Sequence, residues 1–296
     1  MKTNVMVLPE SRSRAIHFLA LTKPRLNFLV VVTAGFGYYL GVLGNLDFLK
    51  LLYTVIGIAL VAGSAAVFNQ IIEHDLDATM ERTRRRPIPS GNVRLSEAWI
   101  FAAMLSVLGT IVLVLGTNWI ASTVALVTLV SYILIYTPLK RRTSYATLVG
   151  AIPGALPPVI GWTAARASLD IEAWVLFGIV FLWQMPHFYS LSWLYRKDFK
   201  RAHLPLLAVR DSDGRRTSRQ ALAYTLALIP MSLIPTFVGL GETTYLAGAS
   251  VLGIMFLIVA IRFAISNSTD HARELFIGSL IYLPLLWGIL VVEHAF

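Results

Sequence analysis

Hydrophobic residues in this chain gather into nine long runs, and polar residues are concentrated in the segments between them. Each run has about 18 residues or more with few charges, which is enough for a helix that crosses a lipid bilayer. The predicted helices cover residues 25–43, 49–77, 96–116, 118–136, 146–162, 171–195, 217–239, 243–264 and 272–292. The pattern therefore predicts an all-α fold, a polytopic membrane protein with nine transmembrane helices.

The composition leaves no room for a soluble domain. Of the 296 residues, 56% are hydrophobic and only 14% are charged, and the mean hydropathy is +0.69. Soluble domains contain about 25% charged residues. We expect one integral-membrane domain over residues 1–296, with a disordered tail at residues 1–14. Because the sequence has no cysteine, disulfides, thiolate metal sites and cysteine nucleophiles are excluded.

The basic residues indicate how the helices are oriented. A net charge of +9 would suit a nucleic-acid-binding protein, but the 25 Lys and Arg residues fall almost entirely in alternate loops. Lys50 and Arg166 are the exceptions on the opposite side. Loops rich in Lys and Arg stay in the cytoplasm. We expect a cytoplasmic N-terminus, a C-terminus on the far side, and the bilayer rather than nucleic acid as the partner.

Three oxygen-bearing side chains follow one another at four-residue spacing at the end of the second run: Asn69, Glu73 and Asp77. Residues four apart share one face of a helix, and acidic side chains at a membrane helix are costly and mark functional sites. Arg82 and Arg86 follow within a basic loop. Carboxylates beside arginines can hold Mg²⁺ and a diphosphate together. The alternative is a solvated helix end whose arginines only set orientation.

Two further groups lie at helix ends predicted on the same side. Tyr136, Lys140 and Arg141 close the fourth run, and Lys197 and Asp198 follow the sixth. The basic side chains of both groups can bind phosphate, but they can equally serve orientation alone. His187 lies inside the sixth run, where a histidine needs a polar partner, and a hydrogen bond between helices explains it as well as catalysis does.

The fifth run is rich in proline and glycine, with Pro153, Gly154, Pro157 and Pro158. Such a segment is expected to be irregular and to line a cavity, although close packing of small residues is the alternative. The sequence contains no phosphate-binding Walker loop, no HExxH and no GxSxG motif. Phosphate must therefore be bound by side chains at helix ends.

These motifs together resemble the UbiA superfamily of intramembrane aromatic prenyltransferases, over nearly the whole chain. Asn69, Glu73 and Asp77 fill the positions of its first aspartate-rich motif. The strongest resemblance is to the branch that acts on haem, whose pattern M-x-R-T-x-x-R-P is matched by Met80, Arg82, Thr83, Arg86 and Pro87. Further similar segments are 136–143, 153–162, 183–188 and 198–207.

The chain departs from the superfamily pattern at a few positions. Gln70 stands where many relatives have Asp, and Glu73 replaces a common Asp. Ala202 occupies the position four after Asp198, where quinone-type relatives are richer in Asp, which favours haem as the acceptor. Ala146 lies near the place where the haem branch often has Asn.

The resemblance implies nine helices around a central cavity open to the bilayer of a bacterial inner membrane. It implies Mg²⁺-dependent transfer of a farnesyl group from farnesyl diphosphate to a vinyl group of protoheme IX, giving haem O and diphosphate. Asn69, Glu73, Asp77 and Asp198 would hold the metal, and the diphosphate would be bound by Arg82, Arg86, Lys140, Arg141 and Lys197. Tyr136 belongs to the same catalytic set, and His187 would contact haem iron or a propionate. A downstream haem-modifying enzyme is a further expected partner.

Two other functions stay open on sequence grounds. One is prenyl transfer to a quinone precursor or another aromatic acceptor. The other is transport, since transporters also place polar residues inside a helical bundle, although they place them near the midplane rather than at the helix ends.

Overall fold

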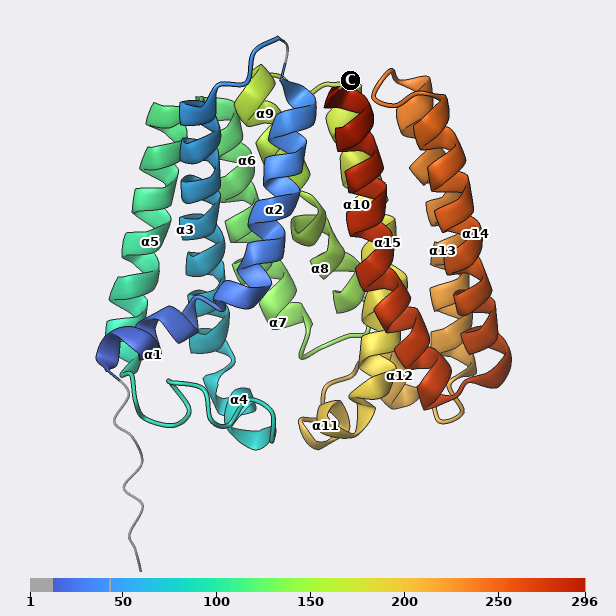
Figure 1. The fold of residues 1–296 in the computed structure, drawn as a ribbon. Coiled ribbons are helices and arrows are strands. Elements are labelled where there is room, and N and C mark those ends of the chain that lie inside the picture. Colours follow the sequence, from blue (N-terminus) through green and yellow to red (C-terminus); the bar gives the residue numbers. More distant parts are fainter. Residues whose placement is uncertain (1–12, 43, 296) are drawn as a thin grey trace, which may run out of the picture.

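The computed structural model describes residues 13–42 and 44–295, and all regular elements within these residues are helices (Figure 1). The first part of the bundle consists of α1 (Arg14–Leu21), α2 (Pro24–Gly41), α3 (Phe48–Ile72), α4 (His74–Thr79), α5 (Leu95–Gly116), α6 (Trp119–Val130), the π-helix η1 (Ser131–Tyr136) and α7 (Thr137–Leu139). The second part consists of α8 (Ala146–Ala155), α9 (Pro157–Arg166), α10 (Ile171–Leu194), α11 (Arg196–Arg201), α12 (Leu207–Arg210), α13 (Arg215–Phe237), α14 (Thr243–Ser266) and α15 (Thr269–Ala295).

Eight helical segments in the described part of the chain are long and apolar enough to cross a membrane. They are α3, α5, the continuous segment from α6 to α7, α8 with α9, α10, α13, α14 and α15. α2 supplies a ninth when it is taken together with α1, from which it bends by 49°. Every predicted run corresponds to one of these segments, with shifted ends. The prediction of an all-α integral-membrane fold is confirmed.

The segment before the first span differs from the sequence prediction. The tail expected to be disordered ends at Arg14, but Arg14 is the first residue of α1 and forms an ion pair with Glu97 of α5. The rest of that expectation, residues 1–12, lies outside the described residues. α1 runs sideways across one end of the bundle in Figure 1, next to α5.

Proline divides the span formed by α8 and α9. Pro157 is the first residue of α9, where its missing N–H costs no helical hydrogen bond. The predicted irregularity of this span is therefore confirmed. α9 also packs closely against α2, because a Cβ at Gly161 would collide with the backbone carbonyl of Ala34. Small residues at such crossings let membrane helices approach each other.

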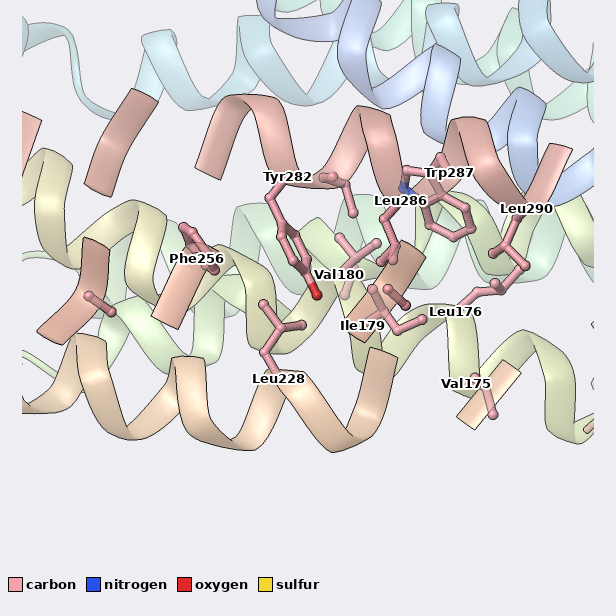
Figure 2. Packing of buried hydrophobic residues seen from close by; sticks show 14 of the residues in the cluster. Val175, Leu176, Ile179, Val180, Leu228, Phe256, Tyr282, Leu286, Trp287 and Leu290 are labelled. Atoms are coloured by element: carbon pink, nitrogen blue, oxygen red, sulfur yellow. The ribbon is translucent and has the colours of Figure 1, made fainter. Parts of the chain in front are cut away.

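A large apolar core joins α10, α13, α14 and α15 (Figure 2). Leu176, Leu228 and Leu286 are fully buried, and Trp287 is only 2% exposed. A separate cluster joins α2, α3, α6 and α9. Large hydrophobic side chains elsewhere point outward, for example Leu115 of α5 at 81% exposure, as expected for a surface that faces lipid. Apolar clusters thus pack the helices in both parts of the bundle.

The polar loops collect at one end of the bundle. Figure 1 shows α1, α4, α11 and α12 at this end and the end of α15 at the other. We call the first the α4/α11 end. The described chain therefore begins and finishes at opposite ends, as an odd number of spans requires.

Candidate active site

The acidic cluster lies where α3 ends at the α4/α11 end. The sequence predicts one continuous helix through Asp77, but α3 stops at Ile72 and α4 begins at His74, with Glu73 between them. The four-residue step is kept across the break, because Glu73 N donates to Asn69 O and Asp77 N donates to Glu73 O. The break turns the chain while keeping all three side chains in the interior, with Asn69, Glu73 and Asp77 exposed by only 4%, 2% and 1%.

Each of the two carboxylates is paired with a cation from another part of the chain. Arg86 Nη1 donates to Asp77 Oδ2 at 2.5 Å, and Lys140 Nζ donates to Glu73 Oε2 at 3.1 Å. Lys140 follows α7, so the fourth and second predicted helices meet here. Charge-assisted hydrogen bonds in buried surroundings are strong and directional. The structure thus brings together the predicted residues Asn69, Glu73, Asp77, Arg86 and Lys140.

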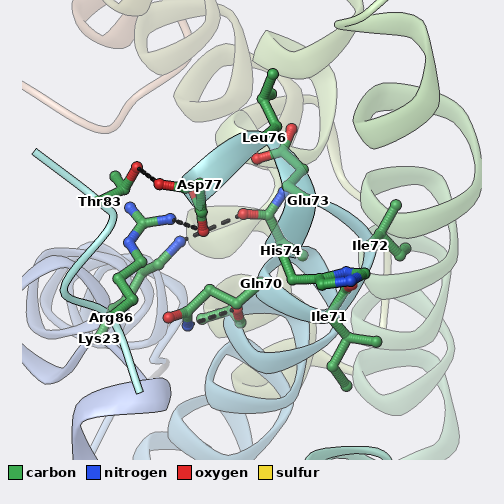
Figure 3. A network of polar contacts seen from close by, with 12 residues as sticks. Lys23, Gln70, Ile71, Ile72, Glu73, His74, Leu76, Asp77, Thr83 and Arg86 are labelled. Atoms are coloured by element: carbon green, nitrogen blue, oxygen red, sulfur yellow. Dashed lines mark hydrogen bonds and ion pairs between the residues drawn. The ribbon is translucent and has the colours of Figure 1, made fainter. Parts of the chain in front are cut away.

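A further cation, Lys23, belongs to the cluster but was missing from the sequence-based set. Its Nζ donates to Asn69 Oδ1 at 3.3 Å, and Figure 3 shows Lys23 and Arg86 turned toward Asp77. Lys23 lies between α1 and α2 in the left-handed region, with φ 49° and ψ 57°, a costly conformation for a residue other than glycine. No local sequence pattern identified Lys23, because it lies 46 residues before Asn69 and meets it only through packing.

Two buried polar side chains hold this arrangement in place. Gln70 Nε2 donates to the carbonyls of Leu21 and Ala66, at 2.6 and 3.0 Å, and so ties α3 to the end of α1 beside Lys23. Thr83 Oγ1 donates to Asp77 O at 2.9 Å and fixes the loop that carries Arg86 (Figure 3). The Gln70 side chain is thus committed to backbone carbonyls in this structure.

The carboxylates retain one free oxygen each. Glu73 Oε1 and Asp77 Oδ1 are buried and have no hydrogen-bond partner. An unsatisfied buried charged oxygen is expensive and calls for a ligand. Hard oxygen atoms are what Mg²⁺ prefers, and Mg²⁺ is commonly held by one or two carboxylates together with water and substrate phosphates. The residues therefore fit a divalent cation whose remaining ligands come from the substrate, and no three His, Asp or Glu side chains of the described chain gather to hold a metal alone.

The π-helix η1 places two tyrosines beside the cluster. Tyr132 and Tyr136 have ring centroids 5.1 Å apart, tilted by 41°. Thr137, which follows η1, donates to Tyr132 O and accepts from Asn69 Nδ2 at 3.4 Å. π-helical turns are rare in proteins overall, and those that occur are often found at functional sites. The predicted residue Tyr136 is thus placed next to the cluster, together with Tyr132, which the sequence analysis did not single out.

Two cavities are bordered by cations of this cluster. The first, of about 200 Å³, starts at Lys23 and is otherwise bordered largely by aliphatic side chains of α2, α3, α6 and α9, such as Val30, Ile58 and Leu129. The second, of about 300 Å³, lies between η1, α8 and α10 and is bordered by Lys140, Tyr136, Gln184 and Phe188, among others. Both are bordered by Tyr132 and Gly154. The site therefore offers an apolar cavity and a more polar, aromatic cavity on either side of the same tyrosine.

Arg141 lies outside the buried cluster. Its guanidinium donates to both oxygens of Asp75, at 2.6 and 3.1 Å, and to the carbonyl of Ile72. The hydrogen bond from Arg141 holds the pKa of the Asp75 carboxyl below its usual value. Asp75 is largely exposed. These contacts join the α3–α4 break to the loop after α7 at the surface.

The predicted residues of the sixth run lie apart from the cluster. His187 Nδ1 is 2.8 Å from Ser279 Oγ of α15 and its ring stacks on Trp183, so it faces α15 and borders neither cavity. Asp198 lies 3.7 Å from Arg201 within α11, and the described residues show no bond from it to the acidic cluster. Lys197 is exposed on the same helix. The structure alone does not bring these three residues to the site.

Arg82 also differs from its neighbour Arg86. It borders the second cavity, its guanidinium lies 5.8 Å from the ring of Tyr195, and it forms no ion pair with any described carboxylate.

Comparison with known proteins places this geometry in a family. The profile of the UbiA prenyltransferase family matches residues 30–287. A protoheme IX farnesyltransferase from Solibacter usitatus (strain Ellin6076) is 44% identical over 286 residues, which cover 94% of this chain and 98% of that protein.

Solved structures show the same fold at low sequence identity. A structure from work on digeranylgeranylglyceryl phosphate synthase has a TM-score of 0.81 and 18% identity and covers 96% of this chain and 99% of its own. A UbiA homologue from Archaeoglobus fulgidus bound to GPP and Mg²⁺ has a TM-score of 0.66 and 12% identity, covering 93% and 99%. The family profile and the full-length identity together show that this chain is a member of the UbiA prenyltransferase family, in the group of the protoheme IX farnesyltransferases.

Proposed function

We propose that this protein transfers the farnesyl group of farnesyl diphosphate to a vinyl group of protoheme IX, forming haem O and diphosphate. The observation that carries the proposal is the pair of buried carboxylates, each with one unsatisfied oxygen, in a cluster whose Lys23 also borders an apolar cavity. The relatives named protoheme IX farnesyltransferase support this choice of donor and acceptor. Because the chain belongs to a prenyltransferase family, we no longer consider transport as its function. Prenyl transfer to a quinone precursor stays the alternative reaction.

The diphosphate would lie at the buried cluster, with the isoprenoid chain in the first cavity. Arg86 and Lys140 pair with Asp77 and Glu73, and Lys23 adds a third nitrogen donor beside them, so an incoming diphosphate would meet three donors at the cluster. The aliphatic border of the first cavity matches a hydrocarbon chain, whose burial gives about 25 cal/mol per Å². The head group and the tail of one donor molecule are thus both accommodated.

Glu73 and Asp77, with Asn69 beside them, would hold Mg²⁺ through the oxygens that have no partner in the protein. A bound Mg²⁺ supplies Lewis-acid stabilisation of the diphosphate as it leaves. The A. fulgidus homologue, whose structure contains GPP and Mg²⁺, supports this assignment. Asp198 stays a predicted further ligand that would have to approach in the substrate complex.

The chain's own side chains would lower the barrier by stabilising charge. When the allylic C–O bond breaks, its electrons go to the diphosphate, where Lys140 and Arg86 are already oriented by their carboxylate partners. The allylic cation lies next to the rings of Tyr132 and Tyr136, and aromatic faces stabilise cations. The terminal vinyl carbon then bonds to the allylic carbon, and water adds to the other vinyl carbon with loss of a proton, giving the hydroxyethyl group.

The orientation follows from the same assignment. The α4/α11 end carries the basic loops and the diphosphate site, so we place it in the cytoplasm, where the water-soluble head group of the donor is available. The C-terminal end of α15 then faces the other side of a bacterial plasma membrane. A haem-modifying enzyme that receives haem O stays an expected partner.

A product assay tests the reaction. The full-length protein in lipid nanodiscs would receive protoheme IX, farnesyl diphosphate and Mg²⁺, and haems would be separated and identified by mass. The expected product is a haem heavier by one farnesyl group and one hydroxyl group. Folded protein that forms no new haem but prenylates a hydroxybenzoate or naphthoate would overturn the choice of acceptor.

A further inference from the structure

Two cavities border the buried cluster, one at Lys23 and the other at Lys140, and their other borders are chemically different. The first has Lys23 at its head and mostly aliphatic side chains beyond. The second contains the aromatic side chains Tyr136, Phe188 and Phe199 together with two cations, Arg82 and Lys140. An isoprenoid tail suits the first border. A planar conjugated ring that carries carboxylates suits the second, because aromatic faces stack on it and cations pair with the acids.

The junction of the two cavities lies where the reaction has to occur. Tyr132 and Gly154 border both, and Tyr132 is part of the turn next to the cluster. The reacting carbon of an allylic diphosphate is the carbon that carries the leaving group, so it lies at the head of the first cavity. An acceptor in the second cavity would reach this carbon from the side opposite the isoprenoid chain.

A close backbone approach shapes the second cavity. Gly150 of α8 lies against the ring of Tyr136, and a Cβ at this position would collide with the ring. Gly154 is in similar contact with the Gln184 side chain, whose Nε2 donates to Ala151 O at 3.2 Å. The two glycines allow Tyr136 and Gln184 to form walls of the cavity rather than fill it.

The two cations of the second cavity differ in what they already bind. Lys140 is engaged with Glu73 at 3.1 Å. Arg82 has no carboxylate partner among the described residues, although Arg86 in the same loop is bound to Asp77. One loop therefore presents Arg86 to the acidic cluster and Arg82 to the second cavity. The guanidinium of Arg82 has its full hydrogen-bonding capacity for an incoming carboxylate.

We propose that the second cavity receives the acceptor and that Arg82 binds a carboxylate of that acceptor, which for protoheme IX is a propionate. This replaces the role in diphosphate binding that the sequence resemblance implies for Arg82, and it rests on the proposed function for the identity of the acceptor. Arg82 is then a specificity-determining residue, whereas Arg86 acts on the donor.

The test compares protoheme IX with its dimethyl ester, in which both propionates are uncharged. Wild-type protein, Arg82→Gln and Arg84→Gln would be placed in nanodiscs, and binding of each haem would be followed by absorption titration against empty nanodiscs. Arg84 is an exposed arginine of the same loop and serves as the matched control. KM values for protoheme IX and farnesyl diphosphate would be measured separately on the same samples.

Loss of one charge-assisted hydrogen bond should weaken protoheme binding at least about tenfold in Arg82→Gln, which corresponds to about 1.4 kcal/mol. The ester should bind wild type and Arg82→Gln equally, and Arg84→Gln should behave as wild type. The KM for farnesyl diphosphate should not change. A higher KM for farnesyl diphosphate with unchanged protoheme binding in Arg82→Gln would overturn the inference.

The binding measurement separates this inference from the proposed function. If wild-type protein makes no farnesylated haem but binds protoheme IX through Arg82, the reaction is rejected and the carboxylate site stands. If turnover occurs and both haems bind wild type and Arg82→Gln alike, the reaction stands and the role of Arg82 is rejected.

Discussion

The chain ends two of its long helices in the same way, at α3–α4 and at α10–α11. In each case a long membrane helix stops, one residue follows (Glu73 or Tyr195), and a helix of six residues carries an aspartate. The surroundings differ. Asp77 is 1% exposed and paired with Arg86, whereas Asp198 is 19% exposed and lies near Arg201, which is itself 62% exposed.

This difference shows that burial, rather than the spacing of acidic residues, distinguishes the two helix ends. At the first end, two carboxylate oxygens are left without partners in a place that water cannot satisfy, so a ligand is needed. At the second end, solvent can satisfy Asp198, and an exposed pair with arginine contributes little. The predictions below test whether the two ends are as unequal as their burial implies.

The largest effect is expected from neutralising the buried carboxylates. Glu73→Gln and Asp77→Asn should each lower kcat by at least about 10²-fold, because each removes charge from the place where the transition state is stabilised. In both variants, the Mg²⁺ concentration that gives half of the maximal rate should rise. Rates and Mg²⁺ titrations of protein with a wild-type thermal unfolding profile would check this.

Asp75→Asn is the matched control for these two variants. Asp75 lies within the same segment but is exposed and bound to Arg141. Its activity should stay within about threefold of wild type, as expected for a surface pair. Full activity of Glu73→Gln or Asp77→Asn at limiting Mg²⁺ would show that the buried end holds no metal.

The next largest effect concerns Arg86. Arg86→Gln removes the partner of Asp77 and a cation of the diphosphate site, so the KM for farnesyl diphosphate should rise about 10- to 100-fold. The KM for protoheme IX should change far less. Steady-state kinetics with each substrate varied in turn would measure both, and an equal rise of the two KM values would contradict the assignment of Arg86 to the donor.

A smaller effect is expected at the second helix end. Asp198→Asn should reduce kcat by about threefold or less if solvent and Arg201 satisfy this carboxylate throughout the reaction. The same assay that is used for Asp77→Asn would measure it. A loss as large as that of Asp77→Asn would mean that the second end closes over the substrate and supplies a metal ligand, as the sequence resemblance implies.

The smallest effect concerns stability at low pH. The hydrogen bond from Arg141 lowers the pKa of Asp75 in the folded protein, so the pair stabilises the fold above the ordinary carboxyl pKa of about 3.9 and loses this contribution as the pH falls further. Asp75→Asn should therefore lower the unfolding temperature slightly at neutral pH, and the difference from wild type should shrink as the pH falls below that value. An identical pH profile for the variant would show that the pair contributes nothing measurable.

The sequence alone was sufficient to predict the nine spans, the membrane class and most of the buried cluster. Long apolar runs have one solution in a bilayer, because every backbone polar group has to be bonded within a helix. Asn69, Glu73 and Asp77 were identified because acidic residues at the end of such a run have no structural reason to be there. Arg86 and Lys140 were identified as cations near phosphate, although their individual carboxylate partners were not.

Only the tertiary structure decided which polar groups meet. Lys23 precedes the cluster by 46 residues and Lys140 follows Glu73 by 67, so no local pattern connects them. The break at Glu73, the π-helix that ends at Tyr136 and the close contacts of the α8 glycines depend on how neighbouring helices pack. Asp77 is more buried than Asp198, and Arg86 is more buried than Arg82. These differences could not be predicted, because the exposure of a side chain depends on segments that are distant in the sequence. The sequence thus determined the spans and the kinds of side chain at their ends, and packing determined which of those side chains form the site.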